Sequence, residues 1–131
     1  MNQVAEIPAQ PTAMQITLPE LKEGEIYIGG FIHADGTGHH TILLPGDYED
    51  APWQYQMDRA AADGADLPTR AELVIMYEQF PEQFQKTWYW SNTEHRDDAE
   101  WAWYQYFYYG GQYRSYKGSE LRARAVRRVL F

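Results

Sequence analysis

Nine aromatic side chains lie within residues 101–116 (WAWYQYFYYGGQYRSY), and this segment limits the folds open to the chain more than any other. Aromatic residues have high β-propensity, whereas Gly110-Gly111 inside the segment is typical of a turn. We therefore predict a strand over 101–109, a turn, and a returning strand over 112–116.

Side chains of a strand alternate between its two faces, so strand 101–109 carries two sets of aromatic residues. The set with the larger apolar groups, Trp101, Trp103 and Phe107, is predicted to face the core. The tyrosines of the other set are predicted to face outward: Tyr104, Tyr106 and Tyr108.

The outward tyrosines and the turn predict a binding surface, because tyrosine offers a large contact area at low rotamer cost and arginine often anchors interfaces. The alternative is a purely structural role, in which the rings stabilise the sheet by cross-strand contacts. The predicted binding residues are Tyr104, Tyr106, Tyr108, Tyr109, Tyr113, Arg114 and Tyr116.

Two helices are predicted before this segment. Thr69 and Glu72 form a capping box at the start of the second helix, and Pro81 ends it. The first helix is predicted over 52–63 from apolar residues at helical spacing, and Gly64 ends it. The face of the first helix is predicted to consist of Trp53, Met57, Ala60 and Ala61.

Further strands are predicted from β-rich runs over 25–32, 40–44, 88–90 and 122–130. The first two form a hairpin, residues 91–100 form a polar loop, and the last strand returns beside the first. This order predicts an α+β fold with two helices packed on an antiparallel β-sheet.

The chain has 131 residues, which predicts a flexible N-terminal arm over 1–20 and a single domain over 21–131. It has no cysteine and no apolar run long enough to span a membrane. The N-terminus also lacks the features of a secretion signal, so we expect a location without export by that route.

The net charge of −8 is divided unevenly along the chain. Residues 1–100 hold 18 acids and 5 bases, whereas residues 101–131 hold 1 acid and 6 bases. Such a molecule repels nucleic acid, so we expect no direct nucleic-acid binding. The basic tail either makes a local patch or neutralises the acidic body within one fold, and we favour neutralisation.

Two groups of side chains resemble metal ligands without matching a known spacing. They are His33, Asp35, His39 and His40, and the acidic residues Glu94, Asp97, Asp98 and Glu100. Ordinary loop histidines and a solvated acidic loop explain them better. We therefore predict no metal, no cofactor and no catalytic residue, and expect that the protein is not an enzyme.

A series of motifs in order along residues 25–131 resembles the Lcl C-terminal-like domain, a domain of unknown function common in phages and prophages. The motifs are Leu67-Pro68-Thr69-Arg70-x-Glu72-Leu73, Trp88-Tyr89-Trp90-Ser91-x-Thr93-Glu94, Ala102-Trp103 with Phe107 and Gly110, Lys117, and Arg124-Ala125-Val126-Arg127-Arg128-Val129. The resemblance implies the C-type-lectin-type fold of formylglycine-generating enzymes, with a binding face on the C-terminal β region. The cysteines of the enzyme relatives have no counterpart here.

The resemblance and the tyrosines together predict a phage- or prophage-encoded domain that binds another protein. It is expected to be either a virion component, oligomeric and held by its arm, or a small acidic inhibitor of a host defence protein in the bacterial cytoplasm. A calcium-dependent glycan-binding lectin is a third alternative. The partner and the oligomeric state stay open.

Overall fold

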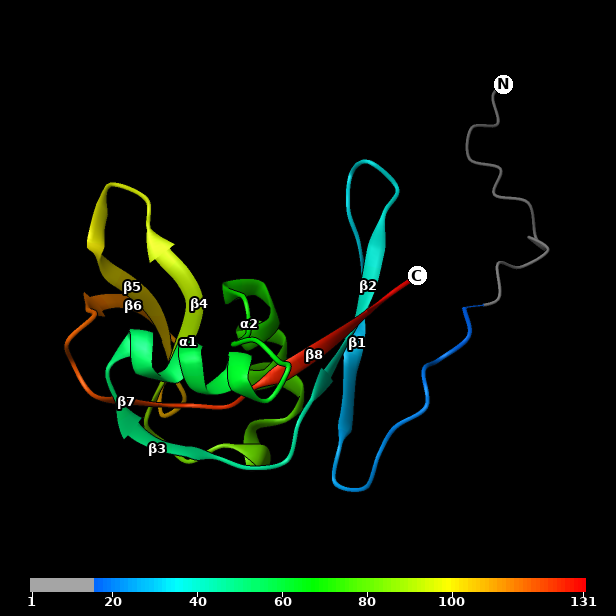
Figure 1. Cartoon of the computed structure of the whole chain (residues 1–131), viewed down its shortest axis with the longest axis horizontal. Helices are drawn as coiled ribbons and strands as arrows, with labels where there is room; N and C mark the ends of the chain where they lie inside the picture. Colours follow the sequence, from blue (N-terminus) through cyan, green and yellow to red (C-terminus); the bar gives the residue numbers. More distant parts are fainter. Residues whose placement is uncertain (1–15) are drawn as a thin grey trace.

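The computed structural model describes residues 16–131 and has an α+β architecture with two sheets and two α-helices (Figure 1). The three-stranded sheet has the order β1-β2-β8 and consists of β1 Ile26–Ile32, β2 Gly38–Leu43 and β8 Val126–Leu130. It projects away from the body of the molecule, next to the N-terminal segment (Figure 1).

The second sheet has five strands in the order β3-β7-β4-β5-β6 and curls around the core. Only Tyr89 and Arg122, which join β4 to β7, form a parallel pair among the described residues of this sheet. The sheet system is therefore mixed, not wholly antiparallel. The strands are β3 Tyr48–Ala51, β4 Trp88–His95, β5 Asp98–Tyr106, β6 Gln112–Tyr116 and β7 Leu121–Ala123.

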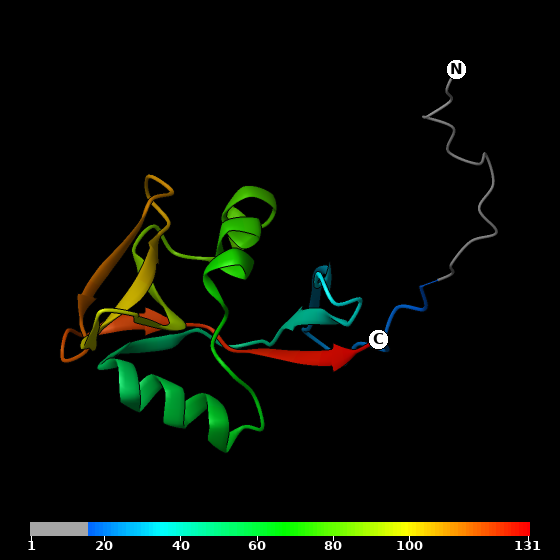
Figure 2. The same cartoon turned by 90° about the horizontal axis from the view of Figure 1, so that it is seen from above.

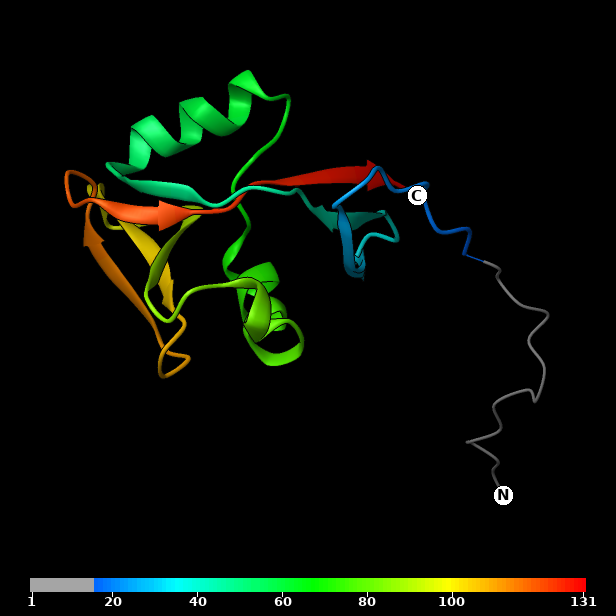
Figure 3. The same cartoon turned by 90° about the horizontal axis from the view of Figure 1, so that it is seen from below.

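The helices α1, Trp53–Ala62, and α2, Arg70–Gln79, lie on opposite sides of the strands (Figures 2 and 3). Helix α1 contacts β3 and β7, whereas α2 contacts β4, β5 and β1. A short 3-10 helix, Pro81–Gln83, follows α2. Each helix thus closes its own apolar cluster against the sheets.

The start of α2 and the end of α1 follow from the local sequence. The Thr69 hydroxyl accepts from the Glu72 backbone N–H at 3.1 Å, and the Glu72 carboxylate accepts from the Thr69 N–H at 2.8 Å, which confirms the capping box. Gly64, with φ +71°, lies just beyond α1. The predicted face of α1 is partly wrong, because Gln56 is buried and Ala61 is exposed.

Gln56 can be buried because its side-chain amide is hydrogen-bonded to the backbone. Its side-chain amide donates to the backbone oxygens of Glu49 at 2.8 Å and Leu121 at 2.9 Å, and so ties α1 to β3 and β7. A buried polar group that is satisfied in this way carries little penalty. Apolar spacing alone does not reveal such a residue.

The hairpin of 25–32 and 40–44 is confirmed as β1 and β2, with a register shift between Tyr27 and Gly29. The prediction of a polar loop over 91–100 is wrong, because β4 continues to His95 and β5 begins at Asp98. Strand β3 was not predicted. Its four residues are too short and too acidic to stand out as a strand.

The predicted last strand, 122–130, is two strands in different sheets. The break lies at Arg124, whose side chain donates to the backbone oxygens of Gln83 at 2.6 Å and Leu44 at 2.7 Å. Strand β8 lies beside β2 and not beside the first strand, so that prediction is also wrong. Because β1 and β2 pair as a hairpin and β8 pairs with β2, β2 is the central strand of this sheet.

The predicted arm falls mostly outside the described residues. Residues 16–20 have no helix or strand, and the Glu20 backbone oxygen accepts from Arg127 at 3.0 Å. The neutralisation of the acidic body by the basic tail is confirmed by ion pairs to residues 25–94. The pairs are Lys117–Glu94, Arg122–Asp47, Arg127–Glu25, Arg128–Asp66 and Arg128–Glu72.

Candidate functional site

The register between β5 and β6 decides which aromatic side chains share a face. Trp101 lies opposite Tyr116, Trp103 opposite Arg114, and Tyr104 opposite Tyr113. Directly opposed residues point to the same face, and neighbours along a strand point to opposite faces. The seven predicted binding residues therefore do not form one surface. Arg114 and Tyr116 lie on the face opposite Tyr104 and Tyr113, which corrects the prediction.

Five of the seven predicted residues do come together, and they are joined by Trp88 from β4. Tyr104 and Tyr113 have ring centroids 6.0 Å apart, and Tyr106 stacks on Trp88 at 5.3 Å. Tyr108 and Tyr109 extend the contact beyond the strand end, with centroids 4.5 Å apart. We call this set the tyrosine stripe: Trp88, Tyr104, Tyr106, Tyr108, Tyr109 and Tyr113.

The stripe has an anchored side and an exposed side. Tyr104 is half-buried against the cluster that contains Trp90, and burial together with Tyr113 and Tyr106 raises its pKa. Tyr106 is also half-buried. By contrast, Tyr109 is 74% exposed and Tyr113 53% exposed. A rigid base therefore carries rings that are open to solvent.

The turn after β5 sets the exposed end of the stripe. The prediction of a strand as far as Tyr109 is wrong, because Gly110 N–H donates back to Tyr106 O at 2.7 Å and closes a turn. Gly110 has φ +87°, and a Cβ there would lie 2.4 Å from the Tyr77 ring. Only glycine meets both conditions without displacement of the ring.

The hydroxyl groups of the stripe differ from those of three tyrosines elsewhere in the fold. Tyr27, Tyr48 and Tyr89 bond to His40, Asp63 and Asp47 respectively. No tyrosine of the stripe has a side-chain hydrogen bond to another part of residues 16–131. These hydroxyls face water, which leaves them available to a partner.

The opposite face of the sheet holds residues that were predicted to lie in the core. Phe107 is buried, as predicted, but Trp101 is 36% exposed and Trp103 is half-buried. The guanidinium of Arg70 covers Trp103 at 3.7 Å from the ring centroid. The size of the side chains was a poor guide because, within β5, the buried position on this face belongs to Gln105.

Gln105 is fully buried because its polar groups are satisfied. Its amide nitrogen donates to Gly110 O at 2.8 Å, and its carbonyl accepts from Gln112 at 2.9 Å. Gln112 also donates to Arg70 O at 2.7 Å. This network fixes the turn that carries the stripe and ties β6 to the start of α2.

A shallow hollow of about 390 Å³ lies next to Trp101 on this second face. It is lined by His95, Asp97, Asp98, Trp101 and Arg114. Across residues 16–131, no three histidine or acidic side chains are placed to hold a metal ion. The acidic group of Glu94, Asp97, Asp98 and Glu100 lies around the β4–β5 turn, where Glu94 pairs with Lys117.

The histidines of β2 point to opposite faces of its sheet. His40 Nδ1 lies 2.8 Å from the Tyr27 hydroxyl, whereas His39 Nε2 lies 3.3 Å from the Glu72 carboxylate. The ring centroids of His33 and His39 lie 5.3 Å apart, with the rings tilted. His33 and His39 therefore contact each other, whereas His40 has separate contacts on the other face.

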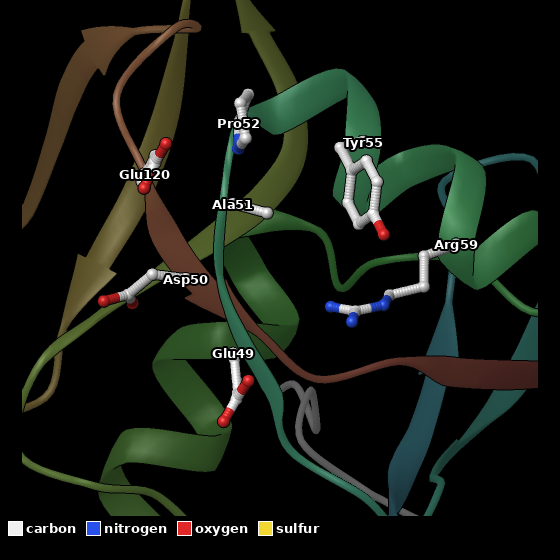
Figure 4. A pocket seen from close by; sticks show the side chains of 7 residues that line it. All are labelled: Glu49, Asp50, Ala51, Pro52, Tyr55, Arg59 and Glu120. Atoms are coloured by element: carbon white, nitrogen blue, oxygen red, sulfur yellow. The ribbon is translucent and has the colours of Figure 1, made fainter.

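Another pocket lies between β3 and α1 (Figure 4). Glu49, Asp50 and Glu120 lie on its strand side, and Tyr55 and Arg59 project from α1. The Arg59 guanidinium lies 5.2 Å from the centroid of the Tyr55 ring. Three carboxylates and one guanidinium therefore line the pocket, and Arg59 forms no ion pair within residues 16–131.

No protein-family model matches the chain, and a search of curated proteins found no match. The resemblance to the Lcl C-terminal-like domain therefore stays a prediction. None of the helices in residues 16–131 has the length and apolar character that a membrane crossing requires.

Proposed function

We propose that this chain is a non-enzymatic domain that binds another protein through the tyrosine stripe. The observation that carries the proposal is the tyrosine stripe, whose hydroxyls have no side-chain partner within residues 16–131. Its rings form two contacting groups, Tyr104 with Tyr113, and Tyr106 with Trp88, Tyr108 and Tyr109. Tyrosine and tryptophan contribute large, rigid contact areas and are enriched among residues that dominate binding energy. The half-buried Tyr104 and Tyr106 supply the rigidity that reduces the entropy cost of binding.

The test compares capture from a bacterial lysate by three forms of the protein. The variant Tyr108→Ser/Tyr109→Ser/Tyr113→Ser removes the exposed part of the stripe and leaves Tyr104 and Tyr106 in place. Tyr116→Ser is the matched control, because Tyr116 is 52% exposed on the same strand as Tyr113 but on the other face. We expect the triple variant to lose a protein that the wild type and the control both capture. Equal capture by all three forms would refute the stripe as the binding surface.

We further propose that the domain is C-type-lectin-like and of phage or prophage origin, as the resemblance of its motifs implies. The α+β order, and a last strand that returns to the sheet of the N-terminal hairpin, support the fold. In that case the protein works in a virion or in the cytoplasm of the bacterial host. Light scattering separates these locations, since a trimer or larger assembly favours a virion component.

The second candidate function is a small acidic inhibitor of a host defence protein. The pocket with Glu49, Asp50 and Glu120 supports it, because three carboxylates on one surface repeat the charge of a nucleic-acid backbone (Figure 4). A monomer in light scattering favours this candidate. Binding that survives the triple tyrosine variant but is lost in Glu49→Gln/Asp50→Asn would establish it instead of the stripe.

The glycan-binding alternative is tested with a glycan array in the presence and absence of calcium. Asp98 accepts from Glu100 N–H at 3.0 Å, so one carboxylate of the β4–β5 turn already has a partner in the chain. We expect no calcium-dependent signal. A calcium-dependent signal would replace the protein-binding proposal with a lectin.

A further inference from the structure

Strand β6 is the outer strand of the five-stranded sheet, and one of its edges has no neighbouring strand (Figure 2). Lys117 N–H donates to Glu100 O, and Tyr106 N–H donates to Gly111 O. Hydrogen-bonded pairs alternate along an antiparallel ladder. The backbone groups of Tyr113 and Ser115 therefore point to β5, and those of Gln112, Arg114 and Tyr116 point outward.

The outward backbone groups of β6 are almost all open. The Tyr116 oxygen accepts from Ser119 N–H at 2.9 Å in the following turn. No backbone hydrogen bond within residues 16–131 involves the outward groups of Gln112 and Arg114. An edge of this kind is a template for a further strand.

The edges of the other outer strands are interrupted. Strand β1 has a register shift between Tyr27 and Gly29, and β3 has one between Tyr48 and Ala51. The outer edge of β8 already bonds to Asp66 at Val126. Strand β6 pairs with β5 in unbroken register and contains neither proline nor a bulge, which are the usual means of blocking an edge.

From these features we infer that β6 accepts an extended segment of a partner protein as an additional antiparallel strand, with an acidic side chain opposite Arg114. The inference rests on the proposed protein-binding function and names the form of the bound segment. Arg114 is exposed and has no ion pair within residues 16–131, although Asp97 and Asp98 line the same hollow. An acidic residue in the added strand would supply the missing charge.

The same charge argues against a second copy of this chain as the occupant. A twofold pairing of two β6 strands centred on Arg114 places the two guanidinium groups directly opposite each other, and like charges in that position are destabilising. The net charge of −8 adds repulsion between copies. In this register the added strand therefore comes from another protein.

The probes are two synthetic peptides, TVTVDVTVT and TVTVKVTVT, titrated into the labelled full-length protein and followed by amide NMR. We expect the aspartate peptide to slow hydrogen exchange at the amides of Gln112, Arg114 and Tyr116, and to bind about threefold to fivefold more tightly than the lysine peptide. Arg114→Glu should reverse the order of the two peptides. Arg114→Pro should abolish both, because proline removes an outward N–H and leaves the ladder to β5 intact.

Unchanged exchange at the amides of Gln112 and Arg114 with about 1 mM peptide would overturn the inference. Slower exchange on raising the protein concentration without peptide would also overturn it, because a second copy would then occupy the edge. Arg114→Glu keeps the test decisive if Arg114→Pro does not fold. If both peptides fail while the triple tyrosine variant still loses its partner, only this inference falls and the proposed function stands.

Discussion

The guanidinium of Arg128 on β8 donates two hydrogen bonds to the carboxylate of Glu72 on α2, from Nη2 to Oε1 at 2.7 Å and from Nε to Oε2 at 2.9 Å. The same carboxylate accepts from the Thr41 hydroxyl on β2. One buried group thus joins the three-stranded sheet to α2, whose Leu73 and Met76 lie in the same apolar cluster as Leu43 of that sheet. This pair is a partly buried polar link between β8 and α2.

Glu72→Gln should destabilise the protein by about 3 kcal/mol, because it leaves Arg128 without its bidentate partner in a buried position. Glu78→Gln on the exposed side of the same helix is the control and should change stability by less than about 0.5 kcal/mol. Denaturant unfolding measures both. Equal stability of the two variants would contradict a structural role for the pair.

The stability of the wild type should fall in acid because of Glu72. Burial alone would raise its pKa, but hydrogen bonds from Arg128, Thr41 and the Thr69 backbone lower it to about 2 from 4.5. A lowered folded-state pKa means that the stabilisation is present above pH 4.5 and is lost as the pH falls towards 2. The loss is about 3 kcal/mol. Unfolding curves of Glu72→Gln should lack this part of the pH dependence, and parallel curves would disprove it.

Tyr89 should make the protein sensitive to alkali. Its burial, opposed by a bond from Gln85 N–H and reinforced by Asp47, raises its pKa to about 12. Because this folded-state pKa lies above the ordinary value of 10.0, the stabilisation is complete below pH 10 and is lost as the pH rises towards 12. Unfolding measured from pH 8 to 12 should show a steeper decline in the wild type than in Tyr89→Phe. The same slope in both proteins would rule out Tyr89 as the cause.

Gly110→Ala should damage the turn that holds the stripe. Gly36→Ala is the matched control, since Gly36 has φ +88° and no atom within 4 Å of an added Cβ. The control should lose about 1 kcal/mol from backbone strain alone, and Gly110→Ala about 2 to 3 kcal/mol because Tyr77 must also move. Thermal unfolding measures the difference. Equal losses would mean that the contact with Tyr77 does not matter.

Features fixed by neighbouring residues were predictable from the sequence. The capping box of Thr69 and Glu72 and the hairpin of β1 and β2 depend on short-range chemistry, and both are confirmed. The prediction of two helices in an α+β fold is confirmed for the same reason. The sequence did not reveal that Glu72 also reaches Arg128, 56 residues further along the chain.

The composition of the candidate site was predictable, but its geometry was not. Five of the predicted tyrosines meet in the stripe, whereas Arg114 and Tyr116 lie on the other face. Alternation within 112–116 already separates Tyr113 from Arg114, so this signal was available in the sequence. Trp88 was missed because its place beside Tyr106 depends on the pairing of β4 with β5.

The burial of Gln105 shows why large apolar residues misled the assignment of faces. A polar side chain can occupy the buried position when its hydrogen bonds are complete, and those partners come from Gly110 and Gln112 after the turn. Trp101 and Trp103 lie on the same face of β5 and stay partly exposed. The burial of Gln105 in place of the tryptophans therefore becomes visible only once the turn is folded.

The role of the tyrosine stripe is tested most directly by the affinity for the captured partner, measured by calorimetry with the purified proteins. We expect Tyr108→Ser/Tyr109→Ser/Tyr113→Ser to weaken binding by about a hundredfold or more, whereas Tyr116→Ser stays within about threefold of the wild type. Circular dichroism of each variant confirms that the fold is retained. An unchanged Kd for the folded triple variant would contradict the claim that the tyrosine stripe is the binding surface.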